Sequence, residues 1–333
     1  MAKDEKDLID VQVDGVWMQM PRGLNVVEVA HRSKKVIPHY CYHPKLSVVG
    51  NCRMCLFEMG TPKMGPDRKP ILAADGKPEI AWMPRPQIGC ATGVTPGMGI
   101  RTDSALVKDC RNGVMEFLLI NHPLDCTICD QAGECHLQDL GYNHGKAGTR
   151  YEFKRRTFEK EDIGPYIQLH MTRCILCYRC TYVADQLTEK RVHGILERGD
   201  HAEISTYISK AIDNDFSGNM IDVCPVGALT DKTFRFKSRV WFTKPVEAHR
   251  NCTKCSGNVR LWFKGEDVLR VTGRKDQWGE VKEFICNECR YDKKNVSDWV
   301  IEQPTHVDRH SVISQNHYEN LKQMKLDVKK LKK

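Results

Sequence analysis

"NHPLDCTICDQAGECHLQD", residues 121–139, places His122 four positions before Cys126 and follows it with Cys129 and Cys135. Two interpretations of this stretch compete. The histidine could end a helix while the cysteines pack as small apolar side chains. Alternatively, all four side chains could bind one metal centre. The other cysteines help to decide, because the protein has 16 of them among its 333 residues.

Composition indicates the cellular compartment. The N-terminus, "MAKDEKDLID", is charged and has no apolar core, so it does not resemble a signal peptide. The longest apolar runs, such as "FLLI" at 117–120, are too short to cross a bilayer. We therefore expect a cytoplasmic chain with no transmembrane segment of its own. In such a reducing compartment, metal binding is the default use for many thiols.

The net charge of +8 is compatible with nucleic acid, an anionic membrane or an acidic protein as partner. The basic surplus is not gathered into one patch interleaved with aromatic residues, and its densest run is the tail at 322–333. The charge pattern therefore argues against nucleic-acid binding.

The cysteines form four groups separated by long stretches of chain. The groups are Cys41, Cys52, Cys55 and Cys90; Cys126, Cys129 and Cys135; Cys174, Cys177, Cys180 and Cys224; and Cys252, Cys255, Cys286 and Cys289. Only Cys110 is left over. It falls on the apolar face expected for a helix over 104–120, with Leu106 and Phe117 among its neighbours, so we interpret it as a packed side chain.

The first group lies in a small α+β module. Residues 8–21 alternate apolar and polar side chains around an Asp-Gly pair, which predicts a hairpin. Residues 25–35 have an asparagine cap and predict a short helix. Strands at 53–59 and 99–103 complete a ferredoxin-like arrangement. Residues 60–88, rich in Gly, Pro and charge, predict a long loop that carries its own small hairpin.

Cys41-x10-Cys52-x2-Cys55, with Cys90 further on, resembles the spacing of a plant-type [2Fe–2S] ferredoxin. Two irons bridged by two sulfides need four thiolate ligands, and these residues supply them. A zinc site is the alternative, which is less favoured because the ten-residue loop is unlike a zinc knuckle. We expect His43 to be an exposed loop residue, because four cysteines already complete the site.

The third group is the most specific signal. "CILCYRC" at 174–180, followed by Cys224 and a proline, has the Cys-x2-Cys-x2-Cys and Cys-Pro pattern of a bacterial [4Fe–4S] cluster. In two-cluster ferredoxins the Cys-Pro ligand serves the other cluster. This chain has no second such triplet, so Cys224 most simply completes the same cubane.

A cubane at 121–139, in addition to the one in the third group, would need a fourth ligand besides its three cysteines. His122 is the nearest upstream candidate and would bind through a neutral imidazole nitrogen. Histidine ligands to iron occur in Rieske centres. His136 and His144 are rivals on spacing alone, although His136 is too close to Cys135 to turn inward easily.

These motifs, in this order, resemble those of the large iron–sulfur subunit of respiratory complex I, the NADH:quinone oxidoreductase. The shared features at 122–139 are His-Pro, Cys-x2-Cys-x5-Cys and Gly-Glu-Cys, while Thr127, Ala132 and His136 differ from the usual residues at non-ligand positions. The resemblance covers about residues 8–300. It implies that the ligands of this cubane are His122, Cys126, Cys129 and Cys135.

The resemblance to the family is weaker at the fourth cysteine group. Family members with a further cubane have Cys-x2-Cys-x3-Cys and a distant fourth cysteine. Here Val259 occupies the third position, and Cys286 and Cys289 form a second Cys-x2-Cys pair. Four such thiolates suit one tetrahedral zinc ion as well as a cubane, although the separation exceeds the usual zinc-ribbon spacing. The residues leave both open, and the resemblance leans towards iron–sulfur. An empty reduced site is the least favoured, because exposed thiols oxidise.

We expect five segments along the chain. They are residues 1–103, a [2Fe–2S] ferredoxin-like β-grasp domain; 104–150, a one-histidine, three-cysteine [4Fe–4S] domain; 151–244, a [4Fe–4S] ferredoxin-type domain; 245–300, a small four-cysteine domain resembling the start of molybdopterin oxidoreductases; and 301–333, a basic tail. The family usually continues into a large molybdopterin-like domain, so molybdopterin chemistry is not expected here. The tail places apolar residues on one helical stripe, which is compatible with docking on a neighbouring subunit or with a solvated end.

The resemblance implies an electron-transfer subunit of the complex I peripheral arm, with one [2Fe–2S] cluster, two [4Fe–4S] clusters and a fourth metal site. The sequence shows no convincing dinucleotide fingerprint or flavin site. NADH oxidation is therefore expected on a flavin-bearing partner, with other iron–sulfur subunits passing electrons to quinone. Proton translocation is expected in the membrane arm. The expected location is peripheral, on the cytoplasmic side of the inner membrane.

The alternative function is the iron–sulfur subunit of a soluble NAD-linked hydrogenase or formate dehydrogenase, which shares the first three sites. The fourth site and the sequence after Cys224 favour complex I. From a different class, a basic zinc protein that binds nucleic acid would be colourless and would bind with a steep salt dependence.

Overall fold

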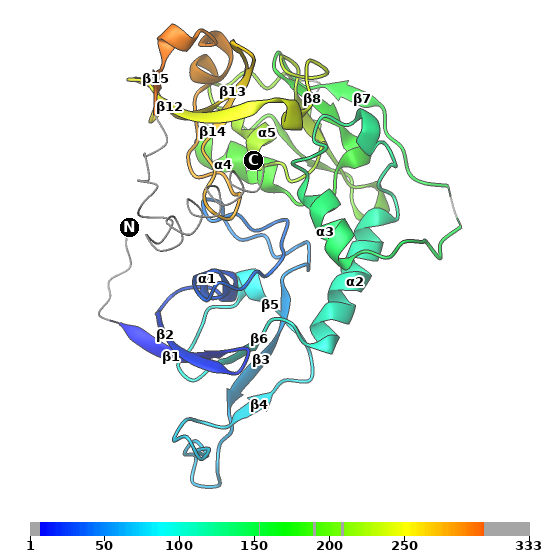
Figure 1. Ribbon diagram of the computed structural model, residues 1–333. Coiled ribbons are helices and arrows are strands. Elements are labelled where there is room, and N and C mark those ends of the chain that lie inside the picture. Colours follow the sequence, from blue (N-terminus) through cyan, green and yellow to red (C-terminus); the bar gives the residue numbers. More distant parts are fainter. Residues whose placement is uncertain (1–6, 153, 189–190, 208–209, 303–333) are drawn as a thin grey trace, which may run out of the picture.

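The computed structural model describes residues 7–152, 154–188, 191–207 and 210–302 (Figure 1). Within these residues the strands form four sheets, and helices pack beside them. The predicted α+β class is confirmed. None of the helices in the described ranges has the length and apolar character that crossing a bilayer requires. The tail stripe at 320–333 lies outside the described residues.

The N-terminal sheet has the order β2-β1-β6-β3-β4, with β5 paired to β3. Its strands are β1 (Leu8–Val13), β2 (Val16–Pro21), β3 (Leu56–Pro62), β4 (Ile80–Trp82), β5 (Gln87–Ile88) and β6 (Gly99–Arg101). The predicted hairpin is confirmed as β1 and β2. Asp14 and Gly15 join these strands with positive φ angles of 48° and 86°, which a two-residue hairpin turn requires.

Helix α1 (Val26–Arg32) packs on this sheet and confirms the predicted short helix. Its N-terminus is fixed by a reciprocal capping box, in which Asn25 accepts from the Glu28 amide and Glu28 accepts from the Asn25 amide. Its apolar side joins the core of the sheet, with Val26 and Val29 fully buried. Helix α1 and the sheet thus form a packed base for the first cysteine group.

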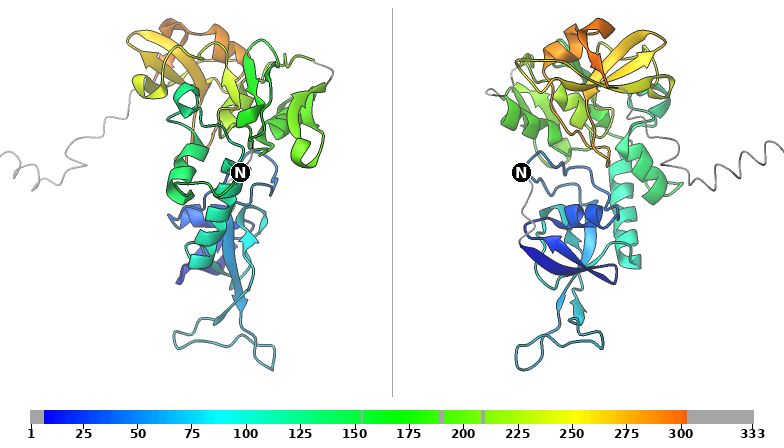
Figure 2. Two further views of the ribbon diagram at one scale, coloured as in Figure 1. Left: turned by 90° about the vertical axis from the view of Figure 1, so that its right-hand side faces the viewer. Right: turned by 60° about the vertical axis from the view of Figure 1, so that its left-hand side comes forward.

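The long loop between β3 and β4 extends the sheet as a projecting hairpin. It stands at the end of the molecule opposite the four-cysteine domain (Figure 2). Isolated bridges join Met64 to Pro70 and Leu72 to Pro78. The Ala73 amide donates to the Lys77 carbonyl at 2.8 Å, so the small hairpin predicted within this loop is confirmed.

Helices α2 (Ala105–Leu119) and α3 (His136–His144) lie against each other. The predicted buried face of α2 is partly wrong, because Leu106 and Phe117 are 40% and 75% exposed. The buried side chains of α2 are Val107, Arg111 and Met115. They face β3 and the first cysteine loop, where the Arg111 guanidinium donates to the Leu56 carbonyl at 3.1 Å. Cys110 is half-buried at the edge of this face.

The central region contains a three-stranded sheet, a separate hairpin and two helices. They are β7 (Lys160–Asp162), β8 (Ile167–His170) and β11 (Leu229–Asp231); β9 (His193–Leu196) and β10 (Glu203–Thr206); and α4 (Arg179–Leu187) and α5 (Asn219–Val223). Helix α4 begins within the third cysteine group, and Cys224 directly follows α5. Both helices therefore position cysteines of the third group.

The last domain is a four-stranded sheet of order β14-β13-β12-β15. Its strands are β12 (Lys244–His249), β13 (Asn258–Lys264), β14 (Asp267–Gly273) and β15 (Val300–Ile301). The segment 274–285, between β14 and Cys286, reaches back to the N-terminal domain, where the Trp278 ring stacks on His31 with ring centroids 4.2 Å apart. We call this segment the return loop. It connects the last domain with the N-terminal domain through this contact.

Candidate metal centres

The first cysteine group gathers beside the N-terminal sheet. Cys52 and Cys55 lie in the loop that leads into β3, and Cys90 lies in a short 3-10 turn after β5. All four side chains of the group are at most 8% exposed. The Cys41 thiol contacts those of Cys52 and Cys90, and the Cys55 thiol also contacts Cys90. A buried set of four contacting thiols has the chemistry that a [2Fe–2S] cluster needs.

His43, predicted to be exposed, is fully buried. Its Nε2 lies 3.9 Å from Glu280, and its ring stacks on Phe284. Both neighbours belong to the return loop, which comes from a different domain more than 200 residues away. The prediction was wrong because local sequence contains no sign of this long-range cover. Burial lowers the pKa of His43 to about 4, with Glu280 partly opposing the shift.

The second group occupies the loop between α2 and α3. Cys126 opens a short 3-10 helix (Cys126–Ile128), and Cys135 directly precedes α3. Cys129 and Cys135 are buried, whereas Cys126 is exposed. Cys129 lies within electrostatic range of both other thiols. Burial is the main cause that raises the pKa of Cys135 to about 12.

His122 fits the role of a neutral ligand. Its Nδ1 is buried and has no hydrogen-bond partner among the described residues. Burial lowers the pKa of His122 to about 4; Asp125 opposes this shift, and Arg173 adds to it. The imidazole is therefore uncharged at neutral pH, and a buried nitrogen without a partner is available to bind iron.

The two rival histidines have other neighbours. His136 lines a surface pocket together with return-loop residues such as Trp278 and Glu280. His144 ends α3 and lies near Arg111 of α2. Their positions support the choice of His122.

The third group surrounds one enclosed, mostly apolar cavity. Its lining includes all four thiols of the group together with Leu169, Ile204, Val226 and Leu229. Leu176 and Tyr178, between the cysteines, adopt positive φ angles of 52° and 64°. Such backbone strain in non-glycine residues is typical of a loop shaped for a ligand. The apolar lining and the strained loop fit a [4Fe–4S] cubane.

Ligand candidates from these three groups meet in a single hydrophobic core. Its buried members include Cys41 and Cys52 of the first group, Cys135 of the second and Cys177 of the third. Tyr40 and Met115 fill the space between them and are fully buried. The Tyr40 hydroxyl lies 3.1 Å from the Met115 sulfur. The three sites are therefore direct neighbours, although their cysteines are far apart in sequence.

The second and third sites are joined through the segment after Cys224. A Cβ atom added to Gly227 would lie 2.2 Å from the Cys129 sulfur, so only glycine permits this approach. The His136 amide donates to the Pro225 carbonyl at 3.0 Å. Nearby, the Arg173 guanidinium donates to Asp125 at 2.5 and 2.9 Å. These contacts fix the position of the loop of the second group relative to the loop of the third group.

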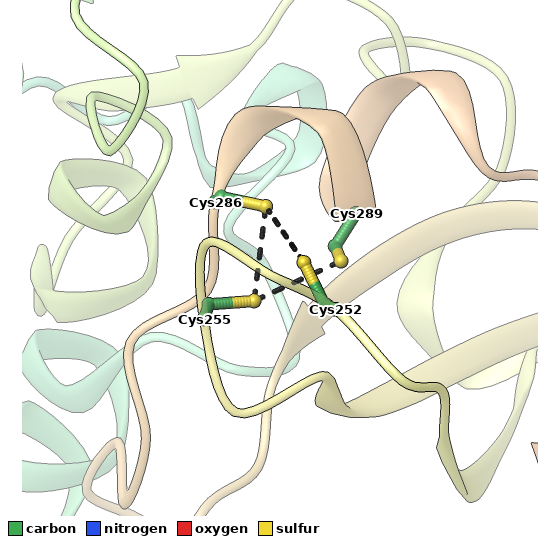
Figure 3. Close-up of side chains that lie close together, drawn as sticks. All are labelled: Cys252, Cys255, Cys286 and Cys289. Atoms are coloured by element: carbon green, nitrogen blue, oxygen red, sulfur yellow. Dashed lines mark hydrogen bonds between the residues drawn. The ribbon is translucent and has the colours of Figure 1, made fainter.

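The fourth group is the most compact. Cys252 and Cys255 lie in the turn between β12 and β13, and Cys286 and Cys289 lie at the start of a short π-helix (Glu288–Asp292) (Figure 3). One sulfur from each residue lies within 4.8 Å of all the others. Val259 is buried in β13 and pairs with Ala248 and Gly273. The structure thus brings together the four cysteines that the sequence grouped.

Arg179 and Glu280 are central to the arrangement and were missed by sequence reasoning. Both side chains are at most 5% exposed and form an ion pair. The Arg179 guanidinium lies within electrostatic range of the Cys177 thiol. Burial alone would raise the pKa of Glu280, but Arg179 and His39 hold it well below its usual value. The position of Arg179 inside "CILCYRC" was the available signal, since a charge between cluster cysteines needs a partner.

Three family models match the chain. They describe a 2Fe-2S iron–sulfur cluster binding domain at residues 6–105, an NADH-ubiquinone oxidoreductase-G iron–sulfur binding region at 111–150, and an NADH-quinone oxidoreductase subunit 3 ferredoxin-like domain at 164–230. The predicted [2Fe–2S] and [4Fe–4S] binding regions are confirmed by these matches. The individual ligands remain predictions.

Curated relatives match over most of the chain. An NADH-quinone oxidoreductase subunit of Rickettsia conorii is 39% identical over 87% of this chain and 39% of its own length. The corresponding Rickettsia bellii protein is 36% identical over 98% of this chain and 44% of its own. The mitochondrial NADH dehydrogenase [ubiquinone] iron-sulfur protein 1 of Solanum tuberosum is 40% identical over 86% and 36%. The chain thus spans about two fifths of the relatives' length.

A solved structure shares the fold. It belongs to an NAD+-reducing [NiFe]-hydrogenase and superposes with a TM-score of 0.58 at 24% identity, covering 70% of this chain and 91% of that one. At this level of identity the likeness concerns the fold alone. The runner-up class from the sequence therefore shares an architecture with this chain.

Proposed function

Because the chain belongs to the family of the large iron–sulfur subunit of NADH:quinone oxidoreductases, we propose that it transfers electrons within such a complex. The observation that carries this proposal is the shared hydrophobic core of the first three sites. Clusters held against one core would be near neighbours, which electron transfer between them requires. The chain would provide ligands, burial and fixed spacing rather than acid–base catalysis.

We assign the ligands of the three clusters as follows. The [2Fe–2S] cluster would be held by Cys41, Cys52, Cys55 and Cys90, the first cubane by His122, Cys126, Cys129 and Cys135, and the second cubane by Cys174, Cys177, Cys180 and Cys224. Iron–sulfur clusters supply reversible one-electron chemistry when bound. The burial of most of these cysteines and the unpartnered His122 nitrogen support the assignment.

The contacts suggest a path through the chain. The Cys177 thiol lies within electrostatic range of Cys41, so the second cubane adjoins the [2Fe–2S] site. The approach of Gly227 to Cys129 supports a position for the first cubane on the other side of the Cys224 segment. The spatial order that follows is [2Fe–2S] site, second cubane, first cubane, which differs from the order in sequence.

The first cubane would lie nearest the surface. Cys126 is the one cysteine of the chain that is exposed, and all 16 lie within the described residues. It lines a surface pocket with Tyr142 and Trp241, which are 93% and 58% exposed. An exposed apolar surface next to a cluster suits the approach of a second iron–sulfur protein. Electrons would leave or enter the chain here.

The partners and location follow from the proposed complex. A flavin-bearing subunit would oxidise NADH and deliver electrons, and further iron–sulfur subunits would pass them towards quinone. Proton translocation would take place in the membrane arm. The chain would lie peripherally on the cytoplasmic side of the membrane, and the finding that no described helix could span a bilayer is compatible with this position.

Low-temperature EPR on the anaerobically purified full chain tests the proposal. After reduction, we expect signals from the three clusters and mutual broadening between them, because neighbouring paramagnets interact. Cys177→Ser should remove the second cubane and the broadening it causes in the other signals. A colourless protein without iron, or signals with no interaction, would contradict the proposed electron path.

A function in an NAD-linked hydrogenase is the second candidate, favoured by the shared fold. Affinity purification of the native complex separates the two. A quinone-reducing complex supports the first proposal, whereas hydrogen-dependent reduction of NAD+ would replace it with the second.

A further inference from the structure

Three of the six sulfur–sulfur distances in the fourth group are short and nearly equal. They are 3.8 Å between Cys252 and Cys286, 3.7 Å between Cys255 and Cys286, and 3.7 Å between Cys255 and Cys289. These separations are far too long for disulfide bonds, whose sulfurs lie about 2 Å apart. Four thiols gathered so closely could hold one metal ion between them.

The distances distinguish one ion from a cluster. Zinc–thiolate bonds are about 2.3 Å long, so sulfurs at the corners of a tetrahedron around one ion lie about 3.8 Å apart. In a cubane each thiolate binds a different iron, and the sulfurs are about 6 Å apart. The thiols of the third group surround a cavity instead, and they are not among the sets of ligand atoms within 4.8 Å in the described residues. Among the residues that the structure describes, the fourth group alone has the spacing of a mononuclear site.

We propose that Cys252, Cys255, Cys286 and Cys289 bind a single zinc ion in a closed tetrahedral site. A site with four thiolates and no open position is typical of structural zinc. Two of the thiols are fully buried, and the other two are half-buried. Zinc has no redox chemistry, so electrons would not pass through this domain.

The backbone supports zinc binding at the first pair. The Lys254 amide donates to the Cys252 sulfur and the Gly257 amide to the Cys255 sulfur, both at 3.4 Å. Such amide donors stabilise metal-bound thiolates. Gly257 has a φ of +69°, and an added Cβ would meet the Arg250 carbonyl oxygen at 2.0 Å. The turn therefore has the shape of a knuckle that only glycine allows.

The structure also explains why the two cysteine pairs are farther apart than in a zinc ribbon. The β13–β14 hairpin lies between the pairs, as the hairpin of a ribbon would. The excess length is the return loop 274–285, which leaves the hairpin to contact His31 and Arg179 and then comes back to Cys286. The long spacing is thus an insertion and does not disturb the site.

The proposed zinc would fix the domain against the second cubane. Arg290, next to Cys289, donates to both oxygens of Asp222 at 2.9 and 2.6 Å, and Asp222 lies two residues before Cys224. The Ile285 amide, next to Cys286, donates to Asn219 of α5 at 2.9 Å. A zinc ion that holds Cys286 and Cys289 would therefore also hold the helix that carries a cubane ligand.

Metal analysis of the anaerobically purified full chain tests this inference. We expect one zinc and about ten irons per chain, from one binuclear cluster and two cubanes. About fourteen irons without zinc would show a fourth cubane and overturn the proposal. About eleven irons without zinc would show a single iron and overturn it as well. X-ray absorption at the zinc edge should show four sulfurs at about 2.3 Å; any other zinc shell would also overturn it.

A variant separates this inference from the proposed electron-transfer function. Cys255→Ser should lose the zinc but keep about ten irons and the three EPR signals, because Arg179 also holds the end of α5 through the Val223 carbonyl. Cys110→Ser is the matched control, since this half-buried thiol lies outside all four groups, and it should keep the zinc. Unchanged zinc in Cys255→Ser would overturn the proposal. If that variant fails to fold, the X-ray absorption spectrum of the unaltered chain at the zinc edge still tests the proposal.

Discussion

Arg179 and Glu280 form a buried, two-point ion pair that joins three parts of the molecule. The two guanidinium nitrogens donate to the two carboxylate oxygens at 2.9 and 2.8 Å. The same guanidinium donates to the carbonyls of Tyr42 and Val223, which adjoin Cys41 and Cys224. One side chain thus contacts the backbone next to a ligand candidate of the [2Fe–2S] site and next to one of the second cubane.

Replacing Glu280 with glutamine should raise the reduction potential of the second cubane. The change removes a negative charge and leaves Arg179 unneutralised within electrostatic range of Cys177, which favours the more negative, reduced cluster by tens of millivolts. Breaking a buried pair from one side also costs about 3–5 kcal/mol of the free energy of unfolding. An EPR-monitored redox titration and thermal unfolding measure the two effects.

Glu283→Gln is the control for this experiment. Glu283 lies on the same return loop but accepts from Ser256 and Asn258, away from the cubane. The potential of the second cubane in this variant should match that of the unaltered protein. An equal shift in both variants would mean that the loop, rather than the Arg179 pair, sets the potential.

His122→Cys should keep the first cubane and lower its reduction potential. A thiolate in place of a neutral imidazole adds a negative charge to the cluster surroundings. His122→Ala should instead lose that cluster, with iron falling from about ten to about six per chain. Iron analysis and EPR measure both results. His144→Ala, at the far end of α3, should retain all the iron; iron loss in this variant alone would move the ligand assignment to His144.

Local sequence patterns predicted much of this structure because their signals lie within a few residues. The Asp14–Gly15 turn and the Asn25 cap follow directly from neighbouring residues. The cysteine spacing likewise grouped the members of the compact fourth site correctly. Turns, caps and short ligand loops depend on local backbone geometry, so sequence was sufficient for them.

The features that sequence did not predict all depend on contacts across long separations. His43 is buried because the return loop folds over it, and Phe117 is exposed because α2 turns Met115 towards the cysteine core instead. The choice between zinc and a cubane at the fourth site needed sulfur–sulfur distances, which spacing alone does not provide. Tertiary packing decided each of these cases.

Gly227→Ala should disturb the first cubane although residue 227 belongs to the loop of the second. An added methyl group would lie 2.2 Å from the Cys129 sulfur, so the thiol or the backbone must move. Overpacking of this kind costs about 1–3 kcal/mol. We expect a weakened or shifted EPR signal from the first cubane. Gly93→Ala, where the added atom meets nothing within 4 Å, should leave the spectrum unchanged.

His31 should make the contact between the return loop and the N-terminal domain sensitive to acid. Burial and the nearby His39 lower the pKa of His31 to about 4, while Asp276 and Glu280 partly oppose the shift. The unfolded chain binds a proton near pH 6.5, so stability present above that pH is lost as the pH falls towards 4.

His31→Phe keeps a ring against Trp278 but cannot be protonated. Between pH 7.5 and 5.5, the unaltered protein should lose about 1 kcal/mol more of the free energy of unfolding than this variant, after allowance for partial solvent exposure of the histidine. Thermal unfolding at both pH values measures the difference. Parallel losses in the two proteins would show that His31 does not contribute.

Tyr142→Glu should slow electron exchange with the proposed iron–sulfur partner without changing the clusters of this chain. Tyr142 is 93% exposed on the pocket that also contains Cys126, so a charge there opposes apolar docking but disturbs little packing. Iron content and EPR signals should remain unchanged, while NADH:quinone activity of the assembled complex falls several-fold. Val16→Glu, at the β1–β2 turn and 60% exposed, provides a matched charge on another face and should retain full activity. Equal activities in the two variants would place the exit of electrons elsewhere on the molecule.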